Sequence, residues 1–474
     1  MNTDNFSRKP IFILLLTYLL LAGVSVFDLS GLLKTYNLRT VDIFSDLKPK
    51  PQKQHKTHIN IASTDKTAVK KPVEDNDPLI ANSEVKKIIR TDTGIEDGDA
   101  NSHQSLVTFL RALFDLKNGK RKKVRIGYFG DSIIEGDMIT QNVRDKLQDS
   151  FGGNGVGFVP ITSIVADFRK TIRHKFSDNW RDINYMNKRT ATNIGISGHT
   201  FFPTGKSTVT FAGTGARHLT TFDKITLLYG QSDTSFSVSF NKTPFEIEGT
   251  SAFNVKEWNH DSAVMKLKVV IDGTSKTPIY GLAIEGDKGI VLDNMSFRGT
   301  SGTELLRLNS KMLTELDSAR HYDLIILQYG PNLLYDVSIT DFSWYYSQMT
   351  KTLHYLKKLF PNTSILLISS TDKAMWVNGA YETAPGVEPL VETQKKLARE
   401  NNCAFFNLYE TMGGYNSMVV WAQKKPILAG SDYTHFNGNG AAKIGKMITN
   451  ALLDKYATFE KQAMMLSINK LLNK

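Results

Sequence analysis

The sequence predicts an α/β domain built on a parallel sheet, interrupted by an antiparallel β domain and preceded by a membrane helix. After His103, short apolar runs alternate with segments of helical spacing, which is typical of a parallel sheet covered on both faces. Residues 163–291 instead alternate polar and apolar side chains with period two, which favours antiparallel strands. Residues 11–27 form an uncharged apolar run that follows Arg8 and Lys9.

Composition bounds the class of protein. The chain has 474 residues, 41% of them hydrophobic, which is enough for two packed domains. Cys403 is the single cysteine, so an intrachain disulfide framework and a cysteine-rich zinc site are excluded. The net charge of +11 suits an anionic neighbourhood, such as a membrane surface or an acidic envelope polymer. The sequence has no dense Lys/Arg cluster with interleaved aromatic residues, so we expect no nucleic-acid partner.

The N-terminal run IFILLLTYLLLAGVSVF is at the short end of the roughly 17–25 residues that span a bilayer. It is slightly long for a signal-peptide core, and Gly23 and Ser25 match a cleavage site poorly. We therefore expect a cytoplasmic tail (1–10) and a signal anchor (11–27) that crosses the cell membrane once, with the rest of the chain exported. A cleaved signal peptide and a buried core helix are the alternatives.

Between the anchor and the first domain, the sequence predicts a tether. Residues 28–47 have some apolar spacing and are expected to form a juxtamembrane segment. Residues 48–101 are rich in Lys, Pro, Thr, Asp and Asn, so they bury too little apolar surface to offset the entropy of ordering, and we expect a disordered linker. The remaining predicted boundaries are 102–162 with 292–457 for the α/β domain, 163–291 for the inserted β domain and 458–474 for an amphipathic C-terminal helix.

Strands and helices of the α/β domain are predicted in order along the chain. Buried strands are expected in VRIGYFG (124–130), DNMSFRG (293–299), YDLIILQYG (322–330), TSILLISS (363–370) and AFFNL (404–408). Segments of helical spacing separate them, and a helix from about residue 440 closes the domain. Ligands bind at the carboxyl ends of the strands in such sheets, so residues that follow strands are the candidates for a site.

The insertion between the first two of these strands is predicted to be an antiparallel sandwich. Phe236, Val238 and Phe240 fall on one side of a strand, and Gly, Asn and Asp turns separate this strand from its neighbours. The insertion is expected either to space and stabilise the protein or to bind a carbohydrate polymer, and the sequence does not choose between them.

The first chemical motif is GDSIIEGD at 130–137. Ser132 follows the first strand and precedes a helix, where free backbone N–H groups can stabilise an oxyanion. A Gly-Asp-Ser sequence by itself is also common in turns and at helix N-caps.

The second motif is SDYTHFNGNG at 431–440, just before the last helix. Asp432 can orient the imidazole of His435, and His435 can act as the base for a serine nucleophile. Two further segments follow strands at the same edge of the sheet. Gly302 in GTSGTELL and Asn332 in QYGPN supply a backbone N–H and a side-chain amide, both suitable donors to an oxyanion.

Together, these segments resemble the four sequence blocks of the SGNH (GDSL-type) hydrolases, from about Val124 to Tyr456 apart from the insertion. The resemblance implies a three-layer, flavodoxin-like hydrolase domain that uses no metal or other cofactor. It implies Ser132 as nucleophile, His435 as base and Asp432 as its orienting carboxylate. It also implies an oxyanion hole formed by the N–H groups of Ser132 and Gly302 and the side chain of Asn332. The third block departs from the family's G-x-N-D pattern, because Leu333 stands where the aspartate is usual.

A narrower resemblance links the chain to bacterial peptidoglycan O-acetylesterase-like proteins. It rests on the first block with its glycine-rich continuation to Pro160, and on MGGYNSMVVW at 412–421. Those relatives carry a β-sandwich, jelly-roll-like in fold, inserted after the first block, which implies the same for residues 163–291.

Three aromatic residues are candidates to contact the substrate: Trp376 and Tyr381, in the segment after the fourth strand, and Trp421, before the Asp-x-x-His motif. Each is equally suited to packing its own loop. The histidines of the insertion show no metal-ligand spacing and are expected to have no role in a metal site: His174, His199, His218 and His260.

The function expected from the sequence is a membrane-anchored serine esterase that removes O-acetyl or other O-acyl groups from a cell-envelope glycan, most simply peptidoglycan. Its partners would be the acylated polysaccharide and, through residues 11–27, the membrane. Two alternatives remain open at this point. One is an O-acyltransferase with the same triad, in which a sugar hydroxyl replaces water. The other is a glycan-binding envelope protein without catalysis.

Overall fold

The computed structural model describes residues 94–98, 105–187, 194–219, 224–259, 265–274 and 276–472. The predicted anchor at 11–27, the juxtamembrane segment and most of the predicted linker lie outside these residues. No helix within the described ranges is both apolar and long enough to cross a membrane.

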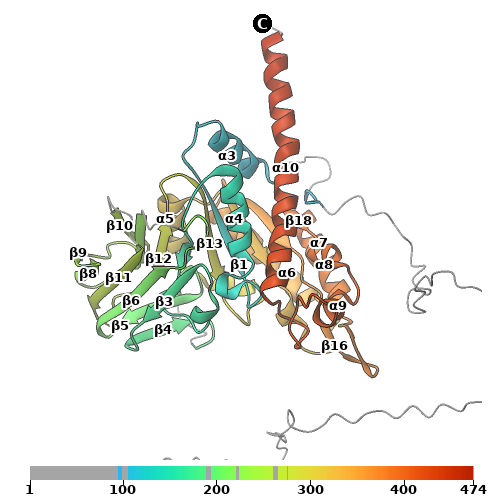
Figure 1. Ribbon diagram of the computed structural model, residues 1–474, viewed down its shortest axis with the longest axis horizontal. Helices are drawn as coiled ribbons and strands as arrows, with labels where there is room; N and C mark the ends of the chain where they lie inside the picture. The colour runs from blue at the N-terminus through green and yellow to red at the C-terminus, as the bar shows by residue number, and fades with distance from the viewer. Residues whose placement is uncertain are drawn as a thin grey trace, which may run out of the picture. The chain divides into compact units, whose positions relative to one another are not determined.

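A five-stranded parallel sheet forms the centre of the α/β part, which confirms the predicted α/β class with a parallel sheet (Figure 1). Its strands, in spatial order, are β13 (Gly289–Ser296), β1 (Lys123–Gly130), β14 (Leu324–Gln328), β15 (Ser364–Ile368) and β18 (Ala404–Phe406). All four pairings are parallel. Nearly every residue of these strands is buried, as expected of a sheet covered on both faces.

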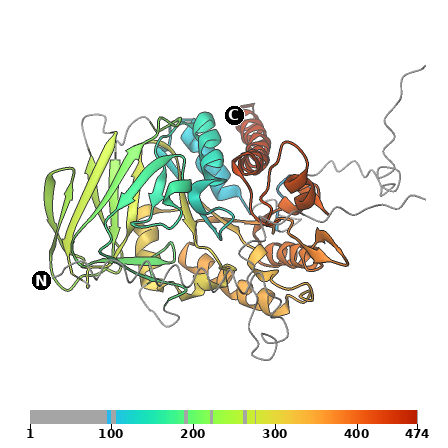
Figure 2. The ribbon, with the colours of Figure 1, turned by 60° about the horizontal axis from the view of Figure 1, so that its bottom comes forward.

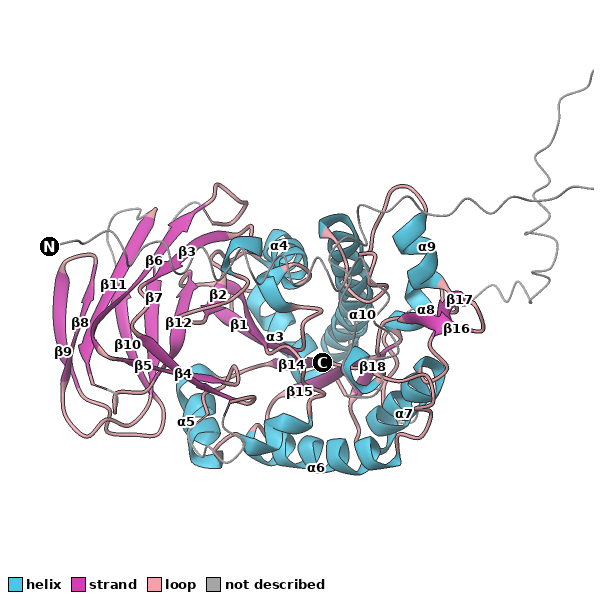
Figure 3. Cartoon of the chain, turned by 90° about the horizontal axis from the view of Figure 1, so that it is seen from below, coloured by secondary structure: helices cyan, strands magenta, loops and turns pink. Residues whose placement is uncertain are grey.

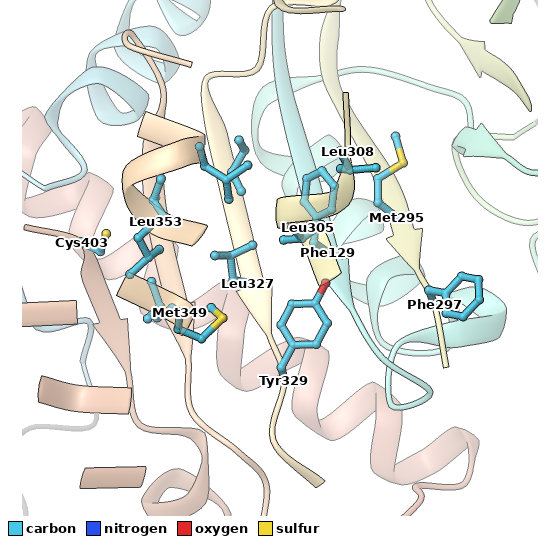
Figure 4. Close-up of a cluster of buried hydrophobic side chains, with 14 of the residues drawn as sticks. Phe129, Met295, Phe297, Leu305, Leu308, Leu327, Tyr329, Met349, Leu353 and Cys403 are labelled. Atoms are coloured by element: carbon cyan, nitrogen blue, oxygen red, sulfur yellow. The ribbon is translucent and has the colours of Figure 1, made fainter. Parts of the chain in front are cut away.

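Helices cover both faces of this sheet, which makes three layers (Figure 3). One face packs against α3 (Val107–Lys117), α4 (Thr140–Phe151) and α10 (Gly438–Leu472). The other packs against α5 (Ser310–Arg320), α6 (Ser343–Leu359) and α7 (Val387–Glu400). Figure 4 shows part of this second core, where Leu327 of β14 lies among Met349, Leu353 and Phe129. Two short helices, α8 (Leu408–Met412) and α9 (Ser417–Gln423), precede α10.

Two antiparallel sheets lie on one side of this α/β part (Figure 2). The first contains β2 (Gly157–Val159), β4 (Trp180–Asn184), β5 (His199–Pro203), β7 (Lys224–Tyr229), β10 (Asn254–Asn259) and β12 (Ile279–Glu285). The second contains β3 (Ile172–Phe176), β6 (Gly205–Gly213), β8 (Phe236–Phe240), β9 (Thr243–Ile247) and β11 (Lys266–Gly273). Alternate side chains of both sheets meet in one buried core, which is why the sequence has period two here.

Several predicted boundaries differ from the structure. Strand β2 pairs with β12, so residues 157–159 belong to an antiparallel sheet although they were assigned to the α/β domain. Strand β13 joins the parallel sheet from Gly289, three residues before the predicted return at 292. The closing helix α10 is continuous to Leu472, so the predicted C-terminal helix at 458–474 is its extension.

Part of the predicted disordered linker also packs on the α/β domain. Ile95 is buried, and Glu96 exchanges two backbone hydrogen bonds with Phe405 of β18, of 2.8 and 2.9 Å. These residues cover the exposed edge of the parallel sheet. Composition alone missed this contact, because a single apolar residue in a polar stretch gives no periodic signal.

A buried cluster of charges joins the antiparallel part to the parallel sheet. Glu285, at the end of β12, receives two hydrogen bonds from Arg125 of β1, of 2.7 and 3.0 Å. Arg320 of α5 lies 3.1 Å from both Glu285 and Asp293 of β13. Burial raises the pKa of Glu285, but the two arginines outweigh it and hold the pKa well below its usual value.

Removing Arg320 tests how much this cluster contributes. In Arg320→Ala, Glu285 and Asp293 remain buried with less compensating charge, and we expect the free energy of unfolding to fall by about 3–5 kcal/mol. Urea denaturation of the two proteins measures it. The matched control is Arg399→Ala, whose side chain is 70% exposed and which should change stability by less than about 0.5 kcal/mol. Equal effects of the two substitutions would contradict this role for the cluster.

Candidate active site

Ser132 lies at the carboxyl edge of the parallel sheet, two residues after β1 ends at Gly130. In parallel register, Gly130 pairs with Ser296 of β13 on one side and with Gln328 of β14 on the other. The segments that follow these three strands therefore start side by side. They carry Ser132, Gly302 and Asn332.

A buried ion pair holds the loop that follows Ser132. Asp137 is fully buried, and Arg144 of α4 donates two hydrogen bonds to it, of 2.6 and 3.0 Å. Burial alone would raise the pKa of Asp137, but Arg144 and Arg169 hold it below its usual value. The sequence expected a helix to begin close behind Ser132. Instead a short 3-10 turn, η1 (Glu135–Asp137), intervenes, and α4 starts at Thr140.

Ser132, His435 and Asp432 form a continuous chain of hydrogen bonds. The Oγ of Ser132 lies 2.9 Å from Nε2 of His435. The Nδ1 of His435 lies 2.6 Å from Oδ2 of Asp432, and Oδ1 of Asp432 accepts the backbone N–H of His435 at 3.1 Å. Partial burial acts to raise the pKa of Asp432, but the hydrogen bonds from His435 and the loop backbone lower it overall. The fold thus brings Ser132 next to the predicted pair Asp432 and His435, which lie about three hundred positions further along the chain.

The loop that carries Asp432 and His435 is held by its neighbours. Gly430 donates a 2.7 Å backbone hydrogen bond to His435, and Tyr433 accepts one of 3.1 Å from Ala374. Tyr433 takes a left-handed backbone conformation (φ 51°), which is uncommon for an aromatic residue and here bends the chain between Asp432 and His435.

Gly302 requires a glycine at its position. Its φ is 93°, and a Cβ placed there would lie 2.8 Å from the ring of Tyr329. Gly302 precedes a 3-10 turn, η3 (Thr303–Arg307). Within the described chain, the backbone N–H groups of Ser132 and Gly302 donate to no other group, which leaves both available to a ligand.

Asn332 bridges the ends of two other segments. It lies in the turn η4 (Pro331–Leu333), and its Nδ2 donates to Oδ2 of Asp131 at 3.0 Å and to the carbonyl of Thr300 at 2.9 Å. Both amide hydrogens are therefore engaged, so an oxyanion would have to share or replace one of these acceptors. Lys373 fixes the turn by donating to the carbonyls of Pro331 and Leu334 at 3.1 and 2.6 Å.

Asp131 is the group that positions Asn332. Its side chain is completely buried, and its Oδ1 accepts the backbone N–H of Ile133 at 2.9 Å. Burial raises the pKa of Asp131 from its ordinary value of 3.8 to about 7, although the backbone N–H groups and nearby His435 act in the opposite direction. These contacts give Asp131 a structural role at the edge of the site.

An aromatic hairpin stands next to the loop of Asp432 and His435. It consists of β16 (Ala374–Val377) and β17 (Ala380–Thr383), where the sequence predicted only a loop. Asn378 and Gly379 both have positive φ, so the Asn-Gly pair makes the turn, a signal that the sequence analysis overlooked. Trp376 is 62% exposed and packs edge-on against Tyr381. Tyr381 in turn stacks on Tyr433 at 4.3 Å.

Trp421 does not lie on this surface, which corrects the sequence prediction. It is only 4% exposed and packs against Phe436, with the ammonium of Lys443 over its ring at 4.6 Å. It therefore stabilises the segment that follows His435 from inside the core. Tyr433, which is partly buried, takes its place beside the exposed residues Trp376 and Tyr381. Tyr433 was not among the predicted aromatic contacts because it lies inside the Asp-x-x-His motif.

The structure pairs two of the insertion's histidines with carboxylates. His199 lies 3.0 Å from Asp182, and His218 lies 2.8 Å from Asp149. Asp145, Asp149 and His218 lie close enough together to share an ion, but Arg217 already occupies Asp149.

Comparison with known proteins rests on solved structures. No known family profile matches the chain, and no curated protein sequence does. A solved structure described as "Peptidoglycan O-acetylesterase in action, 5 min" matches 77% of this chain and 99% of its own, with a TM-score of 0.64 and 20% identity. The chain therefore shares its fold with that esterase. At 20% identity this match supports the fold alone.

Two further structures match with TM-scores too low to support an argument. The acetyl xylan esterase AlAXEase has 21% identity and a TM-score of 0.28, over 34% of this chain and 81% of its own. A family two carbohydrate esterase from Cellvibrio japonicus has 12% identity and a TM-score of 0.23, over 60% of this chain and 98% of its own.

The raised pKa of Asp131 makes stability depend on pH. In the folded state this carboxyl binds its proton more tightly than in the unfolded state, so its stabilising contribution is complete below about pH 4 and is lost as pH rises to about 7. Asp131→Asn is permanently neutral and cannot show this loss. We expect the wild-type free energy of unfolding to fall, relative to the variant, by a few kcal/mol between about pH 4 and pH 8.

Urea denaturation of both proteins across this pH range is the measurement. Asp233→Asn, whose side chain is 67% exposed, is the control and should follow the wild type at every pH. A constant difference between wild type and Asp131→Asn would mean that Asp131 ionises in the same range in the folded and unfolded states.

Proposed function

We propose that the protein is a serine esterase that removes O-acetyl groups from a cell-envelope glycan, with peptidoglycan as the foremost candidate. The observation that carries this proposal is the hydrogen-bonded chain from Ser132 through His435 to Asp432. It lies at the carboxyl edge of a sheet whose fold is that of a structure described as a peptidoglycan O-acetylesterase. That name supports the choice of glycan and acyl group, and the geometry supports the choice of chemistry.

The proposed reaction begins when Nε2 of His435 accepts the proton of Ser132 as Oγ attacks the ester carbonyl carbon. Asp432 holds the imidazole in the required tautomer and stabilises its charged form. The backbone N–H groups of Ser132 and Gly302 donate to the resulting oxyanion, each contributing roughly 3–4 kcal/mol if it behaves as in measured cases. Asn332 joins them when its amide turns from Asp131 or Thr300 toward the oxyanion.

Collapse of the tetrahedral intermediate releases the sugar oxygen, which takes the proton from Nε2 of His435, and leaves an acetyl group on Ser132. Water then attacks this acyl-serine, with His435 again accepting a proton. Breaking the second intermediate frees acetate and restores the serine hydroxyl. Apart from the substrate, these steps use only groups of this chain and one water molecule. His435 returns to its neutral form at the end of each half-reaction.

The exposed aromatic side chains supply a surface for the glycan. Trp376, Tyr381 and Tyr433 form a contiguous group whose last member lies between Asp432 and His435 in the sequence. Aromatic faces bury the apolar side of a ligand while their polar edges remain in water. We assign this group to the sugar next to the reacting ester.

We also propose that residues 11–27 anchor the protein in the cell membrane, with the esterase domain on the exported face. The apolar run and its preceding basic residues support the anchor. The net charge of +11 supports a location beside an anionic polymer.

Acetate release from an aryl acetate and from O-acetylated peptidoglycan tests the proposal. We expect the wild type to release acetate from both, and Ser132→Ala to lose at least about a thousandfold in kcat/KM, because the nucleophile is absent. The control is Ser338→Ala, an exposed serine bonded only to Asp336, which should retain full activity. Retention of more than a tenth of the wild-type rate by Ser132→Ala would exclude the serine mechanism.

A further inference from the structure

Apart from the candidate active site, a cavity opens where the antiparallel sheets meet the loops of the parallel sheet. It has a volume of about 250 Å³. From the α/β part it is lined by the loops that follow β1 and β13, including Glu135 and Phe297. From the antiparallel part it is lined by Asp182 of β4, His199 of β5 and the nearby Ser197. We call it the junction pocket.

Polar atoms converge on one wall of the junction pocket. Nδ1 of His199 lies 3.0 Å from Oδ2 of Asp182, which fixes the imidazole and leaves Nε2 as its second polar atom. Ser197 is 4% exposed, and its Oγ has no hydrogen-bond partner among the described residues. A buried hydroxyl without a partner is costly, and a ligand with a donor or acceptor removes that cost.

Apolar side chains also line the cavity and its mouth. The ring centroids of Phe297 and His199 lie 4.6 Å apart. Figure 4 shows Phe297 just beyond the end of β13, at the edge of the buried hydrophobic cluster to which it belongs. Ile164 and Met186 line the same cavity and are 79% and 66% exposed. Apolar walls with a few converging polar groups are the usual composition of a small-ligand site, and this cavity is slightly smaller than the usual range.

The junction pocket adjoins the candidate active site. The backbone N–H of Phe297 donates to the carbonyl of Gly130 at 2.9 Å, two residues before Ser132. Phe297 and Ser197 also line a smaller void that reaches Gly302, one of the proposed oxyanion donors. Arg298 pairs with Glu135 and so ties the pocket's rim to the loop that follows Ser132. A polymer seated on Ser132 therefore has a second cavity within reach along its chain.

We propose that the junction pocket binds a second, non-reacting sugar residue of the same glycan strand whose acetyl ester is presented to Ser132. The apolar C–H face of a sugar ring suits Phe297 and Ile164, and its hydroxyl or acetamido groups suit Ser197, His199 and Asp182. This inference rests on the proposed function for the identity of the polymer. It gives the inserted sheets a role in substrate selection, because they supply the polar wall.

The experiment compares glycan length. The full chain, solubilised in detergent, is assayed with three substrates: an aryl acetate, an O-acetylated monosaccharide and an O-acetylated tetrasaccharide from peptidoglycan. We expect the wild type to favour the tetrasaccharide over the monosaccharide by at least tenfold in kcat/KM. In Ile164→Arg the new side chain blocks the mouth, and this preference should disappear. Dividing each value by that for the aryl acetate removes any loss of folded enzyme.

The matched control is Val255→Arg on β10. Like Ile164→Arg, it adds one positive charge to the antiparallel part of the chain, at a residue that is 36% exposed and does not line the cavity. It should keep the tetrasaccharide preference. His199→Ala removes a polar group without blocking the mouth and should lower the preference as well.

Binding to the Ser132→Ala protein separates this inference from the proposed function. By calorimetry, the tetrasaccharide should bind at least tenfold more weakly when Ile164→Arg is added to Ser132→Ala. That result together with no hydrolysis by the wild type would reject the esterase and keep the pocket. Unchanged tetrasaccharide binding and preference in Ile164→Arg would overturn the pocket's role.

Discussion

The parallel register of β1 between β13 and β14 is the constraint on which the candidate site depends. It brings Gly130, Ser296 and Gln328 to one level of the sheet, so the segments beyond them leave the same edge together. Ser132, Gly302 and Asn332 are distant in sequence, and this pairing is what makes them neighbours. A shift of one residue would reverse the faces of β1, so each of its side chains would pack against the opposite layer of helices. The same pairing therefore specifies both the core and the site.

Buried polar contacts then set the finer geometry. Asp131 accepts hydrogen bonds from the backbone N–H of Ile133 and from the side-chain amide of Asn332. It therefore links the segment that follows β1 to the segment that follows β14. On the opposite side of Ser132, the loop of His435 is supported by the packed pair Trp421 and Phe436. The reacting groups are half exposed while their supports are buried. This division lets a polymer reach Ser132 without disturbing the residues that orient it.

Much of this organisation could be predicted from the sequence, and the failures have physical causes. The strands of the parallel sheet, the antiparallel insertion and the meeting of Ser132 with Asp432 and His435 follow from periodicity and from motifs at strand ends. Trp421 was misassigned because an aromatic residue beside a motif looks the same whether it packs inward or faces solvent. Ile95 was assigned to a linker because composition averages over the short segment that pairs with β18. The double engagement of Asn332 depends on side-chain orientation, which no spacing reveals.

The inserted antiparallel sheets supply residues to a buried charge cluster and to a cavity at their junction with the α/β domain. Glu285, from their strand β12, enters the buried charge cluster beneath β1 and β13, and Asp182 and His199 line a cavity beside the loop of Ser132. The charge cluster and the junction pocket thus lie at one junction. In our proposal, the same insertion also presents the polymer to the serine.

The central claim is that Ser132 becomes covalently acylated, and the most direct measurement is the mass of the peptide that contains it. The protein is mixed with an aryl acetate, quenched in acid within the first turnovers, digested and analysed by mass spectrometry. The account predicts one added acetyl group on the peptide with Ser132, absent from the Ser132→Ala protein. An acetyl group on another residue, or steady acetate release without any acylated peptide, would contradict it.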